Sequence, residues 1–151
     1  MDVHATLEAP GPAERLFSFV DDLADYPQWM DLVHRVELAA PIDADEGRPA
    51  WQVELRARVG PLARSKRLRM RRTVHDGMAH RVVFERAEAD GRRHSPWVLS
   101  GQVAHRDGVS TLQMHLHYGG ALWTGGVLER VLTDQITSGR ARLAALASST
   151  H

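Results

Sequence analysis

Residues Pro10–Met30 have the sequence Pro-Gly-Pro-Ala-Glu-Arg-Leu-Phe-Ser-Phe-Val-Asp-Asp-Leu-Ala-Asp-Tyr-Pro-Gln-Trp-Met, and they separate one short predicted strand from a long series of strands. Pro12 suits a first helical position, where its missing N–H is not needed. Leu16, Phe17 and Val20 then fall on one helical face at spacings of three and four. The sequence therefore predicts a short amphipathic helix that begins near Pro12.

A second short helix is predicted where Asp25 and Pro27 restart the chain. Tyr26, Trp29 and Met30 are large side chains for so short an element. They either fill the core or line a pocket, so Tyr26 and Trp29 are candidate ligand-binding residues. Together the two helices are expected to close one end of a curved sheet.

The chain between residues 33 and 118 alternates apolar and polar residues and is interrupted by turn-rich sequences, which predicts about six strands. Val3, Ala5 and Leu7 predict one earlier strand, so the sheet has about seven. A long amphipathic helix is predicted over residues 122–147. Its apolar stripe consists of Leu128, Leu132, Ile136, Gly139, Leu143 and Leu146.

These elements predict an α+β fold: a strongly bent antiparallel sheet with the long C-terminal helix across its concave face and the two short N-terminal helices at one end. The 151 residues fit one domain, 1–151. Gly139 lies on the apolar face of the C-terminal helix and leaves room either for a ligand or for close helix packing.

Composition excludes several functions. The chain has 19 basic and 19 acidic residues, so no global field attracts it to nucleic acid or to an anionic membrane. It has no cysteine, which excludes disulfides, zinc–thiolate sites and thiol nucleophiles. The N-terminal residues alternate like a strand and contain no targeting or spanning segment. We expect a soluble, cytoplasmic protein without a cofactor.

The order of elements, the run Ala-Glu-Arg-Leu-Phe-Ser-Phe-Val-Asp-Asp from Ala13, the Tyr-Pro-Gln-Trp that follows and the terminal helix together resemble the SRPBCC superfamily. This superfamily includes START-like lipid carriers, pollen-allergen-like proteins and bacterial polyketide cyclase/dehydrases. The resemblance covers nearly the whole chain. It implies the helix-grip fold and a hydrophobic cavity between the sheet and the C-terminal helix.

Polar residues in otherwise apolar rows of the strands are the candidate catalytic residues. Arg72 shares a row with Leu68 and Met70, and His34 and His80 stand in apolar rows of their own strands. By resemblance to polyketide cyclases, Arg72 would polarise a carbonyl or hold an enolate, and a histidine would move protons. Each could instead be a hydrogen-bonded core or rim residue.

The remaining inward rows mix aromatic and small residues, which suits a flat apolar ligand or the packing of a helix on a bent sheet. The candidate ligand-binding residues in addition to Tyr26 and Trp29 are Trp51, Leu55, Met70, Phe84, Trp97, Leu99, Met114, Tyr118, Trp123 and Ile136. Trp123 belongs to the glycine-rich segment 119–126, which is either an ordinary turn or a gate at the cavity mouth.

Two sets of residues are predicted to face outward. His115 and His117 point the same way from one strand, but no third ligand is near them in sequence, so we predict no metal site. The outward arginines form a basic stripe whose ordinary interpretation is a solvated face. They are Arg56, Arg58, Arg67, Arg69 and Arg71.

Three functions fit these observations. The first is a carrier or sequestering protein for a hydrophobic ligand, an aromatic polyketide or a lipid, including a role in self-resistance. The second is an aromatase/cyclase that folds a poly-β-ketone and assists aldol condensation and dehydration. The third is a protein-interaction module with a filled cavity. Apolar inward rows and the lack of a recognisable nucleophile favour binding.

Overall fold

The computed structural model describes residues 2–59, 61–119 and 127–148. Its elements in chain order are β1 (Asp2–Pro10), α1 (Ala13–Phe17), the 3-10 helix η1 (Leu23–Gln28), β2 (Val33–Leu38), the 3-10 helix η2 (Asp43–Asp45), β3 (Ala50–Val59), β4 (Leu62–Asp76), β5 (Arg81–Arg86), β6 (Trp97–Arg106), β7 (Val109–Tyr118) and α2 (Val127–Ser148).

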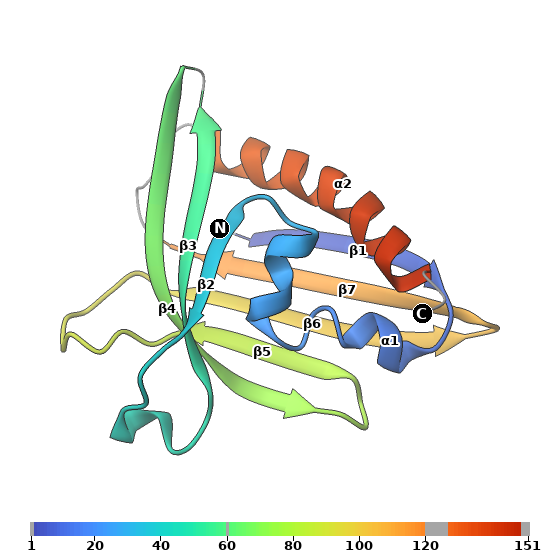
Figure 1. The fold of residues 1–151 in the computed structure, drawn as a ribbon, viewed down its shortest axis with the longest axis horizontal. Coiled ribbons are helices and arrows are strands. Elements are labelled where there is room, and N and C mark those ends of the chain that lie inside the picture. Colours follow the sequence, from blue (N-terminus) through green and yellow to red (C-terminus); the bar gives the residue numbers. More distant parts are fainter. Residues whose placement is uncertain (1, 60, 120–126, 149–151) are drawn as a thin grey trace.

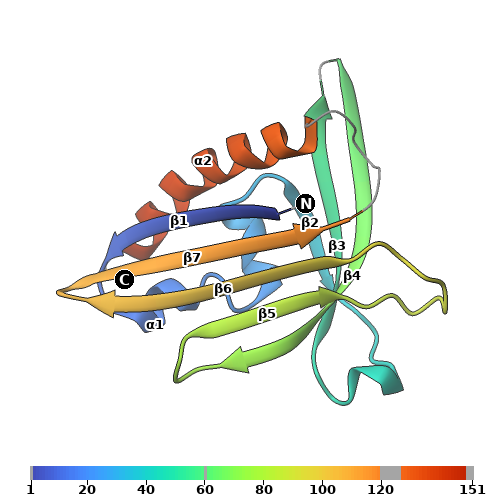
Figure 2. The ribbon, with the colours of Figure 1, turned by 180° about the vertical axis from the view of Figure 1, so that it is seen from behind.

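The strands form one seven-stranded sheet in the order β1-β7-β6-β5-β4-β3-β2, and every neighbouring pair is antiparallel. The sheet is strongly bent, because β3 and β4 rise steeply from the plane of β6 and β7, and α2 lies across the hollow (Figure 1). Seen from behind, β1, β7 and β6 lie in front of α1 and η1 (Figure 2). The predicted helix-grip α+β fold is confirmed.

The short helices begin where local chemistry favours them. Pro12 is the extended residue just before α1, which confirms the predicted start. The second short helix predicted around Asp25 and Pro27 is confirmed as η1, which begins at Leu23, where the Asp22 side chain caps it by accepting a hydrogen bond from the Ala24 N–H at 2.9 Å.

Helix α2 packs closely against the end of η1 and is hydrogen-bonded to the residues just before β2. A Cβ atom added to Gly139 would lie 2.5 Å from the Trp29 carbonyl oxygen. On either side of Gly139, the Gln135 Oε1 accepts a hydrogen bond from the Leu32 N–H at 2.8 Å, and Arg142 pairs with both carboxylate oxygens of Asp31 at 2.6 and 2.8 Å. Close helix packing therefore accounts for the glycine.

Strand β2 contains an irregularity that changes which side chains face inward. Its pairing with β3 shifts register between Val33 and Arg35. Val33 is buried, whereas His34 is exposed and Leu38 is 74% exposed. The predicted inward row containing His34 and Leu38 is therefore wrong, because simple alternation does not continue through the shift.

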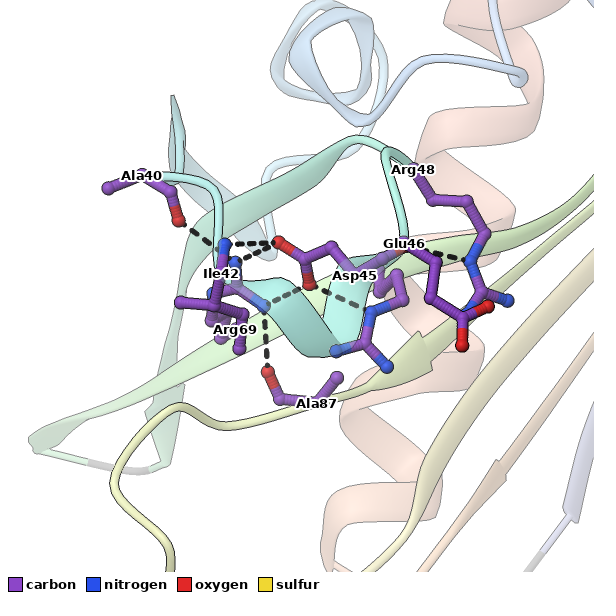
Figure 3. A network of polar contacts seen from close by, with 8 residues as sticks. Ala40, Ile42, Asp45, Glu46, Arg48, Arg69 and Ala87 are labelled. Carbon is purple, nitrogen blue, oxygen red and sulfur yellow. Dashed lines mark hydrogen bonds and ion pairs between the residues drawn. The ribbon is translucent and has the colours of Figure 1, made fainter.

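The outer face of β4 carries a buried ionic network (Figure 3). Arg69 and Asp45 are each only 1% exposed. Two nitrogens of Arg69 donate to the two oxygens of Asp45 at 2.8 and 2.7 Å, and the Arg71 Nε donates to the same carboxylate at 2.9 Å. Arg69 also donates to the carbonyl oxygens of Ala40 and Ala87. The expected solvated face is wrong at Arg69, because the segment containing η2 covers it.

Candidate ligand-binding cavity

A cavity of about 110 Å³ lies between the concave face of the sheet, η1 and α2. Almost all of its lining is apolar. Its walls are formed by Val3, Ala5, Thr6, Leu7, Leu23, Tyr26, Trp29, Met30, Leu32, Val33, Val53, Leu55, Leu68, Met70, Trp97, Leu99, Leu112, Met114, Leu116, Ile136, Arg140 and Leu143. The sheet supplies most of these residues, because alternate side chains of a bent sheet converge on its concave face.

Eight of the twelve candidate ligand-binding residues lie in this wall. They are Tyr26, Trp29, Leu55, Met70, Trp97, Leu99, Met114 and Ile136. The structure thus brings together side chains from η1, β3, β4, β6, β7 and α2 that are widely separated in the sequence. Contact of these residues with a ligand stays a prediction.

Three other candidates are buried beside the cavity rather than in its wall. Phe84 packs edge-on between Tyr26 and Trp51, with ring centroids 6.2 and 5.6 Å away. Tyr118 packs on Trp97 at 5.1 Å. Such perpendicular and offset pairs are favoured by the ring quadrupole, so these residues support the wall from behind. Trp123 lies outside the described residues.

Arg72 occupies the concave face near the cavity, but its guanidinium is already engaged. Its Nη1 donates to the Asp21 carbonyl oxygen at 2.9 Å, and its guanidinium carbon lies 5.8 Å from the centre of the Trp51 ring. These contacts join β4 to the segment between α1 and η1. Arg72 does not line the cavity.

The two candidate histidines lie away from the cavity. His34 is exposed and faces a shallow surface hollow beside Arg56 and Arg58. His80 precedes β5 in a left-handed conformation with φ of 53°, and its Nε2 is 3.6 Å from a carboxylate oxygen of Glu14. His80 lies directly before β5, is partly buried, and packs its ring edge-on against the buried Phe17 at 5.5 Å, so it stands outside the cavity wall and its catalytic role stays a prediction.

Two of the polar atoms in the wall have partners within the protein. The Tyr26 hydroxyl donates to the Val20 carbonyl oxygen at 2.8 Å, and burial raises the pKa of this phenol far above its usual value. The Trp29 Nε1 donates to the Phe19 carbonyl oxygen at 3.1 Å. Both groups therefore hold η1 in place, and neither titrates near neutral pH.

Two other polar groups in the wall have no such hydrogen-bond partner among the described residues. Trp97 is 3% exposed, and its Nε1 is buried with no hydrogen-bond acceptor among the described residues. Arg140 is the one charged side chain among the described lining residues, and it is exposed on its solvent side. Sequence reasoning missed Arg140, although its spacing of four residues from Ile136 and three from Leu143, both on the apolar stripe of the helix, could have indicated it.

The outer face of β1 and β7 brings four polar side chains together. His115 Nε2 and His117 Nδ1 share one oxygen of Asp2 at 2.7 and 3.0 Å, and His4 stacks on His115 at 4.4 Å. Asp2 and His4 are on β1, more than a hundred residues away in sequence, so spacing could not indicate them. Across the described ranges, no three or more acidic, histidine or cysteine side chains are placed to hold a metal ion.

Comparison with known proteins agrees with this architecture. A family model described as polyketide cyclase / dehydrase and lipid transport matches residues 1–148. The chain belongs to this family. No curated protein matches the sequence. Among the helices described, none combines the length and apolar character needed to cross a bilayer.

Many solved structures share the fold. The Zhui aromatase/cyclase from Streptomyces sp. R1128 has 13% identity and a TM-score of 0.70, covering 97% of this chain and 93% of its own. A START superfamily protein from Mycobacterium smegmatis has 18% identity and a TM-score of 0.65, covering 95% and 94%. A protein from Thermus thermophilus has 18% identity and a TM-score of 0.64, covering 97% and 93%. At these identities the likeness is one of fold.

Proposed function

We propose that this protein binds a small hydrophobic molecule in the cavity between the sheet and α2, and carries or sequesters it without transforming it. The observation that carries the proposal is the cavity wall itself. Apart from Arg140 and Tyr26, none of the lining residues that the structure describes has a titratable side chain, and the Tyr26 hydroxyl is committed to a backbone carbonyl. Transfer of apolar surface from water into such a wall is favourable by about 25 cal/mol per Å².

The positions of the candidate catalytic residues support binding rather than catalysis. A general acid or base must come within about 3 Å of the proton it moves, directly or through one water. Arg72, His34 and His80 are not among the lining residues, and Arg72 and His80 contact other protein groups. A cyclase would need one of them to turn into the cavity.

The volume of the cavity limits the size of the ligand that it can hold. A dry apolar cavity of about 150 Å³ in another protein holds benzene. At about 110 Å³ this cavity is smaller, so a ligand body of one aromatic ring or a short acyl chain already requires a modest adjustment of the wall. Met30, Met70 and Met114 line it, and because methionine side chains repack easily, a larger aromatic polyketide or lipid would enter by displacing them.

The test uses two neighbouring residues of β6 that point to opposite faces of the sheet. Leu99 lines the cavity, whereas Val98 does not. Leu99→Trp should fill the cavity and weaken binding of propylbenzene by at least about tenfold, which corresponds to 1.4 kcal/mol. Val98→Trp adds bulk on the outer face and should leave the affinity within about twofold.

Isothermal titration calorimetry would measure the affinities, and circular dichroism would confirm that both variants are folded. Equal loss in the two variants would show that binding does not occur in the cavity. Absence of binding to the unmodified protein, with propylbenzene, decanol and naphthalene alike, would overturn the proposal and favour an interaction module.

A further inference from the structure

We propose that the ligand is an oxygenated apolar acid: its carboxylate pairs with Arg140 at the edge of the cavity, and a second oxygen on its body accepts a hydrogen bond from the Trp97 Nε1. This inference rests on the proposed function and names the ligand class. It comes from two polar groups of the wall, on α2 and β6, for which the described part of the chain supplies no side-chain hydrogen bond or ion pair.

Arg140 differs from the other arginine on this part of α2. Arg142 makes two short hydrogen bonds to Asp31, so its charge is already compensated. The side chains three and four positions from Arg140 along the helix are Ile136, Thr137, Leu143 and Ala144, none of which is acidic. Within the described part of the chain, Arg140 makes no ion pair or side-chain hydrogen bond.

The position of Arg140 suits a ligand headgroup. Its neighbours one turn away on α2, Ile136 and Leu143, also line the cavity, so the aliphatic stem of Arg140 extends the apolar wall. Its guanidinium remains in contact with solvent. A guanidinium presents parallel N–H donors that match the two oxygens of a carboxylate. An acid could therefore keep its headgroup partly hydrated while its body enters the cavity.

Trp97 indicates independently that the ligand carries a hydrogen-bond acceptor. A buried N–H without an acceptor is costly, and such groups in native proteins usually have an explanation. The indole N–H only donates, so its partner must be an acceptor such as a hydroxyl, carbonyl or ether oxygen. The Nε1 is itself covered, so a ligand oxygen would reach it only when the wall around Trp97 opens; a purely hydrocarbon body would then leave this donor unpaired, whereas an oxygenated body would satisfy it.

The experiment compares four probes that differ by one group at a time. Propylbenzene has neither oxygen function, para-propylphenol has the ring oxygen, phenylpropanoic acid has the carboxylate, and para-hydroxyphenylpropanoic acid has both. For the unmodified protein at neutral pH, we expect the carboxylate to raise affinity about fivefold to tenfold and the ring oxygen about threefold to tenfold, as hydrogen bonds of about 1 kcal/mol each would do.

Three variants separate the contributions. Arg140→Gln should remove the advantage of the two acids over their neutral analogues, measured as the ratio of each acid's affinity to that of its neutral analogue in the same variant. Arg142→Gln is the matched control, because it removes a charge from the same helix outside the cavity wall, and it should keep the advantage. Trp97→Phe should remove the advantage of the two hydroxylated probes while preserving that of the carboxylate.

The contribution of Arg140 should also depend on ionic strength. Because its guanidinium is exposed, the preference for the acids should shrink between about 0.01 and 1 M salt. Affinity for propylbenzene should not fall over the same range. A merely structural role of Arg140 would not produce this difference.

The outcomes distinguish this inference from the proposed function. If propylbenzene binds but the acids bind no more tightly, or if Arg140→Gln and Arg142→Gln weaken the acids equally, the assignment of Arg140 is overturned and cavity binding stands. If the ring oxygen gives no advantage, or the advantage persists in Trp97→Phe, the assignment of Trp97 is overturned. If none of the four probes binds, the proposed function fails as well.

Discussion

The two faces of β4 differ in the charged side chains that they carry. On the outer face, Arg69 is fully buried and shares the Asp45 carboxylate with Arg71. On the inner face, Leu68 and Met70 line the cavity, and this wall contains no ion pair among the described residues. Burying an unpaired ion costs several kcal/mol, so charge enters the interior only where a partner is supplied. The closed ionic network is therefore structural, whereas the inner face is apolar where it lines the cavity, as the proposed binding of a hydrophobic molecule requires.

Removing the carboxylate from the outer network should have the largest effect. Asp45→Asn removes the carboxylate that pairs directly with the buried Arg69 guanidinium, and breaking a buried pair in this way costs about 3 to 5 kcal/mol. Urea unfolding followed by circular dichroism would measure the loss. Glu46→Gln, at an exposed carboxylate on the same segment, should change stability by less than about 0.5 kcal/mol. A loss below about 1 kcal/mol for Asp45→Asn would mean that the network tolerates an unpaired arginine.

The same network should make stability depend on acid pH. The hydrogen bonds from Arg69 lower the pKa of Asp45 far below its usual value, although burial alone would raise it. A carboxyl group whose pKa is lower in the folded state contributes stability above its unfolded pKa of about 3.9, and this contribution is lost as pH falls further.

Unfolding experiments between about pH 6 and pH 2 would check this dependence. As the pH falls over that range, the Asp45→Asn variant should lose less stability than the unmodified protein. The stability gap between the two proteins should therefore be smaller at acid pH than at neutral pH. Parallel pH profiles for the two proteins would show that Asp45 titrates alike in the folded and unfolded states.

On the inner side, α2 packs so closely on the end of η1 that there is no room for a side chain at Gly139. Alanine normally stabilises a helix by up to about 1 kcal/mol relative to glycine. Here its Cβ would lie 2.5 Å from the Trp29 carbonyl oxygen, so α2 would have to move. Gly139→Ala should therefore destabilise the protein by about 1 to 3 kcal/mol in thermal or urea unfolding. Ser138→Ala, at the exposed neighbouring position, should have no destabilising effect, and a gain in stability from Gly139→Ala would show that the packing is looser.

The smallest effect is expected at Arg72, the inner-face counterpart of Arg69. Its Nη1 donates to one backbone carbonyl, and the side chain is only partly buried. Arg72→Gln should cost about 1 kcal/mol, the value of one hydrogen bond, and should leave propylbenzene affinity unchanged in calorimetry. A tenfold or greater loss of affinity would place Arg72 in the binding site and favour the catalytic role predicted for it.

The sequence by itself determined the kinds of elements and their order. Alternation, helical spacing and turn residues are local properties, so the seven strands, the early helix near Pro12 and the C-terminal helix could all be predicted. The same alternation placed Leu55, Met70, Leu99 and Met114 on the concave face, where they line the cavity. It failed at His34, because a register shift in β2 has no signature in the alternation.

Only the tertiary structure decided which charged groups are buried, paired or open. Arg69 is buried because the segment around Asp45, 24 residues earlier in the chain, folds over it. Arg140 borders the cavity because Gly139 lets α2 come close to η1. The environment of a side chain is created by residues distant in sequence, and the energy of a charge depends on that environment far more than on its own strand or helix.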